Sequence, residues 1–193
     1  MVMLNPARLL LTCLFIFSPL CASAQSWGLP QLMDAMAKVE SSQSRFTEKK
    51  TLALFKAPLE SSGTLSYRRP GFVEKHVLSP QDEVITVEGD KLTWQNNATN
   101  KKRSIRLQNN PPIWAFVESI RATLAGELKT LQRFYYVSLE GNANRWTLIL
   151  SPADDAMREN VKTLRIEGSG NRITLVDILE ASGDRSVMTI QHD

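Results

Sequence analysis

Few residues in this chain are suited to catalysis or to binding a metal ion. The sequence contains two histidines, His76 and His192, and two cysteines, Cys13 and Cys21. Zinc sites combine such residues at close spacing, and no HExxH-like pattern occurs here. There is no GxSxG nucleophile motif or phosphate-binding loop either, and Gly168-Ser169-Gly170 lies between two expected strands, as is typical of a turn. The sequence therefore predicts no metal site, no cofactor and no enzymatic activity.

Asp154 and Asp155 are the carboxylate pair best placed for acid–base chemistry. They follow Pro152 and precede Met157, a pattern typical of the start of a short helix. Aspartate is a preferred helix N-cap because its side chain accepts a backbone N–H bond. We therefore interpret the pair as a helix cap, with a hydrolase built on scattered carboxylates as the alternative.

The charge balance argues against nucleic acid as a partner. With 23 basic and 20 acidic residues, the net charge is only +3. The densest basic cluster, Lys101, Lys102, Arg103 and Arg106, has no interleaved aromatic residues on which bases could stack. Lysines discourage pairing at the edge of a sheet, so we expect this cluster on a solvated edge strand. Attraction to an anionic membrane surface or an acidic partner is the alternative.

The first residues have the pattern of an export signal. Arg8 precedes an apolar run from Leu9 to Phe17, and Ala22-Ser23-Ala24 resembles a signal-peptidase site. A membrane span needs about 20 apolar residues, so a cleaved signal peptide over residues 1–24 is favoured over an anchor. Leu20 precedes Cys21, which does not fit a lipidation signal. We expect one soluble, exported domain over residues 25–193, which would contain no cysteine.

Two amphipathic helices are expected in that domain. The first is indicated by apolar residues at helical spacing: Leu29, Leu32, Met33, Met36 and Val39. The second follows Asn109-Asn110-Pro111-Pro112, can stop at Gly126, and is widened by Trp114. Its apolar stripe comprises Ile113, Phe116, Val117, Ile120 and Leu124.

The rest of the domain has the period of β-strands. Five short runs occupy residues 45–94, a sixth lies around 102–107, and later runs cover 133–140, 145–151, 161–167, 172–180 and 186–191. This predicts a mostly β (α+β) fold with about eleven antiparallel strands, and so large a sheet tends to curl or close. The two helices would then cover its concave face. They could enclose a cargo cavity or simply pack as core helices, because both arrangements have the same sequence pattern.

Several motifs carry a resemblance to a known family. They are Phe46 within SRFTEKK, Gly63-Thr64-Leu65-Ser66-Tyr67, the Arg69-Pro70 step, Pro80, and the segment VITVEGDKLTW. Together with the order of helices and strands, they resemble the LolA-like periplasmic outer-membrane lipoprotein carriers over nearly the whole mature chain. The resemblance implies an incomplete, strongly curved β-barrel whose helical lid covers a cavity for acyl chains. It also implies that Arg69 is the arginine that bonds to the lid backbone and acts as its latch.

The alternation of side chains along the strands and the apolar stripes of the helices predict which residues form the site. Leu65 and Tyr67 share the parity of Arg69, and Arg68 should face outward. We expect cargo contacts from Leu65, Tyr67, Trp94, Trp146, Leu148 and Leu150, and a lid underside formed by Met33, Met36, Trp114, Phe116 and Val117. The methionine stripe also fits ordinary packing, and Arg69 also fits a surface arginine before a turn proline.

The resemblance also implies cargo and partners. These are an acylated lipoprotein or other lipid, an inner-membrane donor complex and an outer-membrane acceptor, served by a periplasmic monomer. Glu74-Lys75-His76 replaces an aromatic residue common in these carriers, and the chain ends at Asp193 without their longer C-terminal extension. Both departures indicate a divergent branch, for which a glycolipid or polyene lipid handled with an inner-membrane exporter is the alternative cargo. The alternative of another class is a β-rich assembly or interaction protein that carries nothing.

Overall fold

The computed structural model of the chain describes residues 27–192. The predicted signal peptide, residues 1–24, lies outside this part. Within residues 27–192, no helix is both long enough and apolar enough to cross a membrane.

One 11-stranded antiparallel sheet forms most of the described fold, in the spatial order β6-β5-β4-β3-β2-β1-β11-β10-β9-β8-β7. The two ends of the sheet, β6 and β7, are edge strands, so the barrel is incomplete as expected. The strand bounds are β1 Ser41–Thr51, β2 Leu59–Arg68, β3 Phe72–Ser79, β4 Glu83–Glu88, β5 Lys91–Asn96, β6 Lys101–Arg106, β7 Tyr135–Asn142, β8 Arg145–Pro152, β9 Val161–Ser169, β10 Arg172–Glu180 and β11 Arg185–Gln191.

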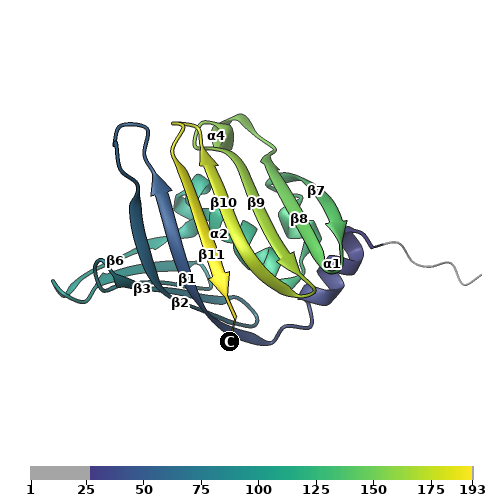
Figure 1. Cartoon of the computed structure of the whole chain (residues 1–193), viewed down its shortest axis with the longest axis horizontal. Coiled ribbons are helices and arrows are strands. Elements are labelled where there is room, and N and C mark those ends of the chain that lie inside the picture. Colours follow the sequence, from purple (N-terminus) through teal and green to yellow (C-terminus); the bar gives the residue numbers. More distant parts are fainter. Residues whose placement is uncertain (1–26, 193) are drawn as a thin grey trace, which may run out of the picture.

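The sheet curves around the helices. In Figure 1 the strands from β11 to β7 run steeply across the view, the strands around β2, β3 and β6 turn towards the horizontal, and α2 lies behind the sheet. The mostly β, strongly curved sheet predicted from sequence is therefore confirmed. The basic cluster lies on β6, whose position at the edge of the sheet is also as predicted.

The two predicted helices are present, with smaller ones beside them. They are α1, Leu29–Met36, and α2, Pro111–Ala125, and both begin with proline in the first turn. Gly126 ends α2 in the left-handed conformation, with φ of 72°. The shorter elements are η1 Leu107–Asn109, α3 Leu128–Leu131 and α4 Asp155–Arg158. Asp154 caps α4 by accepting a bond from the Met157 backbone N–H at 2.8 Å, which confirms the interpretation of this aspartate.

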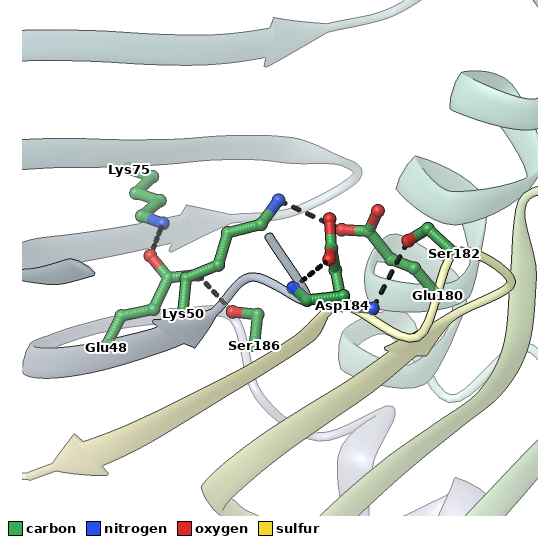
Figure 2. Close-up of polar contacts among 8 residues, drawn as sticks. Glu48, Lys50, Lys75, Glu180, Ser182, Asp184 and Ser186 are labelled. Carbon is green, nitrogen blue, oxygen red and sulfur yellow. Dashed lines mark hydrogen bonds and ion pairs between the residues drawn. The ribbon is translucent and has the colours of Figure 1, made fainter. Parts of the chain in front are cut away.

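The seam between the first and last strands lies in the middle of the sheet. β1 pairs with β11 from Arg45 opposite Gln191 to Thr51 opposite Arg185. Two side-chain contacts extend the seam beyond the ladder: Lys50 Nζ pairs with Glu180 Oε1 at 2.9 Å, and the Ala53 N–H donates to Asp184 Oδ1 at 2.8 Å (Figure 2). The turn after β10 is thereby fixed against the loop after β1.

One end of the concave face is filled by a hydrophobic core. Helices α1, α2 and α3 pack there against β7 to β10, and Trp146, Leu148 and Leu150 of β8 are 0% exposed. A second, smaller cluster lies around Val87, Leu107 and Val117, where α2 packs against β4 and η1. Helix α2 thus contacts the sheet in two separate regions.

Candidate functional site

A cavity of about 360 Å³ lies between α2 and the sheet. Its walls come from α2 and from β1 to β5, β10 and β11, so it lies over the middle of the curved sheet. The five apolar residues of the predicted α2 stripe all line it: Ile113, Phe116, Val117, Ile120 and Leu124. Leu65, Val73, Ile85, Val176 and Met188 are among the apolar residues on the sheet side. The cavity therefore offers an apolar compartment under a helix.

One ion pair interrupts the apolar surface of the cavity wall. Glu48 Oε2 accepts hydrogen bonds from Lys75 Nζ at 2.5 Å and from Ser61 Oγ at 3.2 Å. Its other oxygen accepts a bond from Ser186 Oγ at 2.5 Å (Figure 2). Glu48 and Lys75 are both mostly buried, with side chains 16% and 22% exposed, and the Lys75 ammonium also lies 4.9 Å from the centre of the Phe46 ring. Both oxygens of the carboxylate are thus occupied.

The surroundings of Glu48 keep it ionised. Burial by itself would raise the pKa of Glu48, but the charge of Lys75 and hydrogen bonds from Lys75, Ser186 and Ser61 outweigh it, and the pKa is lowered. At neutral pH the cavity wall therefore carries an ion pair with no net charge. Sequence reasoning missed this pair. The alternation Ser42, Ser44, Phe46, Glu48 was the available signal, because it puts Glu48 on the inward face of β1.

Arg69 joins the sheet to both helices. It lies just after β2, and its Nη1 donates to Ala37 O, at the C-cap of α1, at 2.7 Å. Its Nη1 and Nη2 also approach Ala125 O, at the last residue of α2, at 3.5 and 3.4 Å. Helix C-termini leave carbonyl oxygens unpaired and carry partial negative charge, which suits a guanidinium. One side chain thus holds two helix ends beside the sheet.

Arg121 makes the reverse connection, from α2 to two turns of the sheet. Its Nη1 donates to Gly89 O, between β4 and β5, at 3.0 Å and pairs with Glu118 Oε1 at 3.1 Å. Its Nη2 lies against Gly71 in the turn after β2, where an added Cβ would come within 2.8 Å of it. No sequence pattern indicates this contact, since it joins residues far apart in the chain.

The predicted cargo residues lie in different parts of the concave face. Leu65 and Tyr67 line the cavity, whereas Trp146, Leu148 and Leu150 lie in the filled core. Trp94 is opposite the cavity residue Ile85 and is partly buried, with its Nε1 donating to Glu83 Oε2 at 3.2 Å.

The predicted lid residues divide in the same way. Phe116 and Val117 line the cavity, and Met33 and Met36 of α1 are buried in the filled core. Trp114 packs edge-on against Phe134, with ring centres 5.3 Å apart. Helix α2 therefore covers the cavity, while α1 packs against the filled end.

Neither histidine has metal-ligand surroundings. In residues 27–192, no three His, Cys, Asp or Glu side chains are grouped closely enough to hold a metal ion. His76 Nε2 bonds Asp82 Oδ1 at 2.8 Å, and His192 Nε2 donates to Ile173 O at 2.6 Å.

Comparison with known proteins identifies the family. The model of the family described as "Outer membrane lipoprotein carrier protein LolA-like" matches residues 21–190. The chain belongs to this family. An outer-membrane lipoprotein carrier protein of Pseudomonas entomophila is 23% identical over 175 residues, which cover 88% of this chain and 80% of the relative. One of Yersinia pestis is 29% identical over 120 residues, covering 55% of this chain and 59% of the relative.

Solved structures are more distant. A LolA superfamily protein from Nitrosomonas europaea aligns with a TM-score of 0.46 and 10% identity, covering 86% of this chain and 92% of that one.

Membership has three direct consequences. LolA-like proteins are lipoprotein carriers, so the expectation that this chain is not an enzyme is confirmed by its family. They take part in lipoprotein transport, and they are periplasmic. The resemblance found in the sequence is therefore confirmed at the level of the family.

Proposed function

We propose that this LolA-like chain carries the acyl chains of a lipoprotein, or of another acylated lipid, in the cavity beneath α2. The main support for this proposal is the cavity of about 360 Å³, which is lined by the α2 stripe and by apolar residues of the sheet such as Leu65 and Ile85. Each methylene moved from water into an apolar site gains about 0.8 kcal/mol. A cavity of this kind can therefore match the free energy that an acyl chain gains in a membrane, which lets the cargo pass between the two.

Arg69 and Arg121 give the proposed carrier a means of opening. Arg69 is the lid latch in this proposal, and its bonds to Ala37 O and Ala125 O are charge-assisted. A bond of that kind contributes about 1.5 to 3 kcal/mol, a size that cargo or a membrane partner can offset. Arg121 holds α2 from the other side through Gly89 O. A lid held by a few such contacts can release cargo without unfolding of the sheet.

The proposed route runs from the inner to the outer membrane. Residues 1–24 would act as the export signal, and residues 25–193 would form a periplasmic, monomeric domain. An inner-membrane donor would load it and an outer-membrane acceptor would unload it. The periplasmic location of the family supports this route.

The Glu48–Lys75 pair favours a second candidate cargo. A cavity built only for alkyl chains has no need for a buried ion pair, which costs desolvation free energy. Here Lys75 has donors beyond its bond to Glu48, in a wall that is otherwise largely apolar. This observation favours a lipid with a polar group within reach of Lys75, such as a glycolipid, handled with an inner-membrane exporter.

Cavity occupancy tests the proposal. Native mass spectrometry of protein purified from the periplasm should detect co-purified lipid, and acylated peptide should displace a fluorescent hydrophobic dye. Lipid extraction and mass analysis would then separate lipoprotein from glycolipid or polyene cargo. A correctly folded protein that binds neither lipid nor dye would overturn the carrier proposal and favour a β-rich assembly protein.

A further inference from the structure

Two buried hydrogen-bond donors in the cavity wall have no partner among the described residues. They are Tyr67 Oη and Arg121 Nε, and Tyr67 is only 4% exposed. Tyr67 projects from β2 and Arg121 from α2, and both line the cavity. Buried polar groups without partners are rare because each costs free energy, so two such donors on side chains that line one cavity point to a ligand atom.

The other contacts of Arg121 fix where its free donor lies. Nη1 is committed to Gly89 O and Glu118, and Nη2 lies against Gly71. One side of the guanidinium thus lies on Gly71, whose added Cβ would come within 2.8 Å of Nη2 and 2.9 Å of Nε, and Nε has no hydrogen-bond partner among the described residues. Glu118 forms an ion pair with Arg121, and this partial neutralisation lowers the attraction of Arg121 for an anionic ligand.

Tyr67 is a donor at neutral pH. Burial raises the pKa of its phenol, and Glu127 and Glu40 add to this effect, against the charges of Arg69 and Arg121. With a pKa above its ordinary value of 10.0, the phenol keeps its proton. The phenol and the guanidinium influence each other electrostatically, which agrees with their lining the same cavity.

We propose that Tyr67 Oη and Arg121 Nε together bind the carbonyl oxygen of an ester- or amide-linked acyl group, whose alkyl chain then lies along the apolar cavity. This inference rests on the proposed carrier function and adds the group that the carrier recognises. A carbonyl oxygen has two lone pairs and accepts two donors. It is uncharged, as the Glu118-paired guanidinium favours, and it is attached directly to an alkyl chain, as the apolar lining requires.

A matched pair of lipids tests the carbonyl. A monoacylglycerol and an alkylglycerol ether of the same chain length differ at the linkage, where only the ester has a carbonyl. Wild-type protein is expected to bind the ester about thirtyfold more tightly than the ether, or more, in dye displacement, the effect of two hydrogen bonds, one of them charge-assisted. The ester carbonyl stretch should also shift to lower frequency in the infrared spectrum of the complex.

Tyr67→Phe removes one of the two donors and is expected to lower the ester-to-ether affinity ratio about fivefold. Tyr136→Phe is the matched control, because it removes a phenol that is 69% exposed and should leave the ratio unchanged. Arg121→Lys should also lower the ester-to-ether ratio. Any change in lid stability would alter the affinities for the ester and for the ether equally, and would therefore cancel in the ratio.

The outcomes separate this inference from the carrier function. If folded wild-type protein binds neither lipid, both are overturned. If it binds both lipids equally, the carrier function stands and the carbonyl site is overturned. A wild-type ratio that persists in Tyr67→Phe also overturns the site.

Discussion

Arg69 connects three elements through a single side chain, and this makes its role testable. Replacing it with leucine removes the donors to Ala37 O and Ala125 O, while the adjacent β2 ladder is kept. We expect Arg69→Leu to release bound dye about tenfold faster, since each charge-assisted bond contributes about 1.5 to 3 kcal/mol. Stopped-flow dilution of the dye-loaded protein would measure this rate.

Arg68→Leu is the matched control. Arg68 is exposed, points to the other face, and stacks on Phe72 with its guanidinium 4.7 Å from the ring centre. It should release dye at the wild-type rate. Equal loading and release in wild type and Arg69→Leu would remove the latch role of Arg69.

Glu48 gives the domain a defined acid sensitivity. Its pKa is lowered in the folded protein from an ordinary value of 4.5. The ion pair therefore stabilises the fold fully at pH values above the ordinary pKa. This stabilisation is lost as the pH falls through the lowered pKa of the folded protein. Between about pH 6 and about pH 3, we expect wild type to lose more free energy of unfolding than Glu48→Gln, as measured by urea denaturation.

The control for that measurement is Glu60→Gln. Glu60 is an exposed carboxylate on the neighbouring strand β2, so its removal should leave the wild-type pH slope intact. Parallel slopes for wild type and Glu48→Gln would show that the ion pair does not contribute to acid sensitivity.

Single side chains differ in how far the sequence predicts them. Alternation along β2 was enough to place Leu65 and Tyr67 on the inward face, where the cavity lies. Alternation along β1 could equally have placed Glu48 on that face, but a charge is not expected on an apolar face unless its partner is known. That partner, Lys75, comes from another strand, and the contact of Arg121 with Gly89 depends entirely on how α2 docks.

At the scale of elements, Gly126 sets the distance between α1 and α2. It ends α2 with φ of 72°, and an added Cβ would lie 2.2 Å from Met33 O and 2.7 Å from Ala37 N. Gly126→Ala must therefore push the two helices apart. We expect a loss of about 3 kcal/mol or more in the free energy of unfolding, against the 1 to 2 kcal/mol typical of the left-handed conformation alone.

Gly170→Ala isolates the conformational part of that cost. Gly170 also has positive φ, 55°, but an added Cβ would meet nothing within 4 Å. Denaturant unfolding of both variants should show a clearly larger loss for Gly126→Ala. Equal losses would mean that α1 and α2 can separate without cost.

The long helices and most strands followed from their apolar periods, but short local features did not. The expected strands over 133–140 and 145–151 left residues 141–144 as their connection, whereas β7 continues to Asn142 and the turn falls at Ala143 and Asn144. The reason is local: Asn142 Oδ1 accepts a bond from the Asn144 N–H at 2.9 Å, which makes the turn there. Helix α3 is only 4 residues long, so it shows no period to detect.

At the scale of the whole molecule, the concave face has a filled end and an open region. Leu65→Trp, in the cavity wall, should fit into the free volume, keep the domain folded and weaken dye binding. Leu148→Trp, in the filled core, should overpack it and cost about 1 to 3 kcal/mol of stability. Thermal unfolding and dye titration of both variants would measure the difference. Unimpaired dye binding by Leu65→Trp would place the dye outside this cavity.

The division between filled core and cavity could not be predicted from the strands alone. Leu148 and Leu65 sit in the same kind of alternating pattern, and only the position of the helices decides which is covered. Helices α1 and α3 reach the region of β8, while the wall around Leu65 faces α2 across the cavity. Sequence could predict the curved sheet and its cover, because both follow from strand number and helix amphipathicity, but the fit of one to the other is a property of three-dimensional packing.

The pairing of β1 with β11 also affects the order in which parts of the molecule fold. Synthesis makes β1 first and β11 last, yet the two are neighbours in the middle of the sheet. Contacts so distant in sequence slow folding, because the intervening chain must be ordered before they form. Two halves of the sheet, β1 to β6 and β7 to β11, can begin as local hairpins, but the cavity that spans them is complete only after the final strand docks. We therefore expect the binding compartment to be among the last parts of the molecule to form.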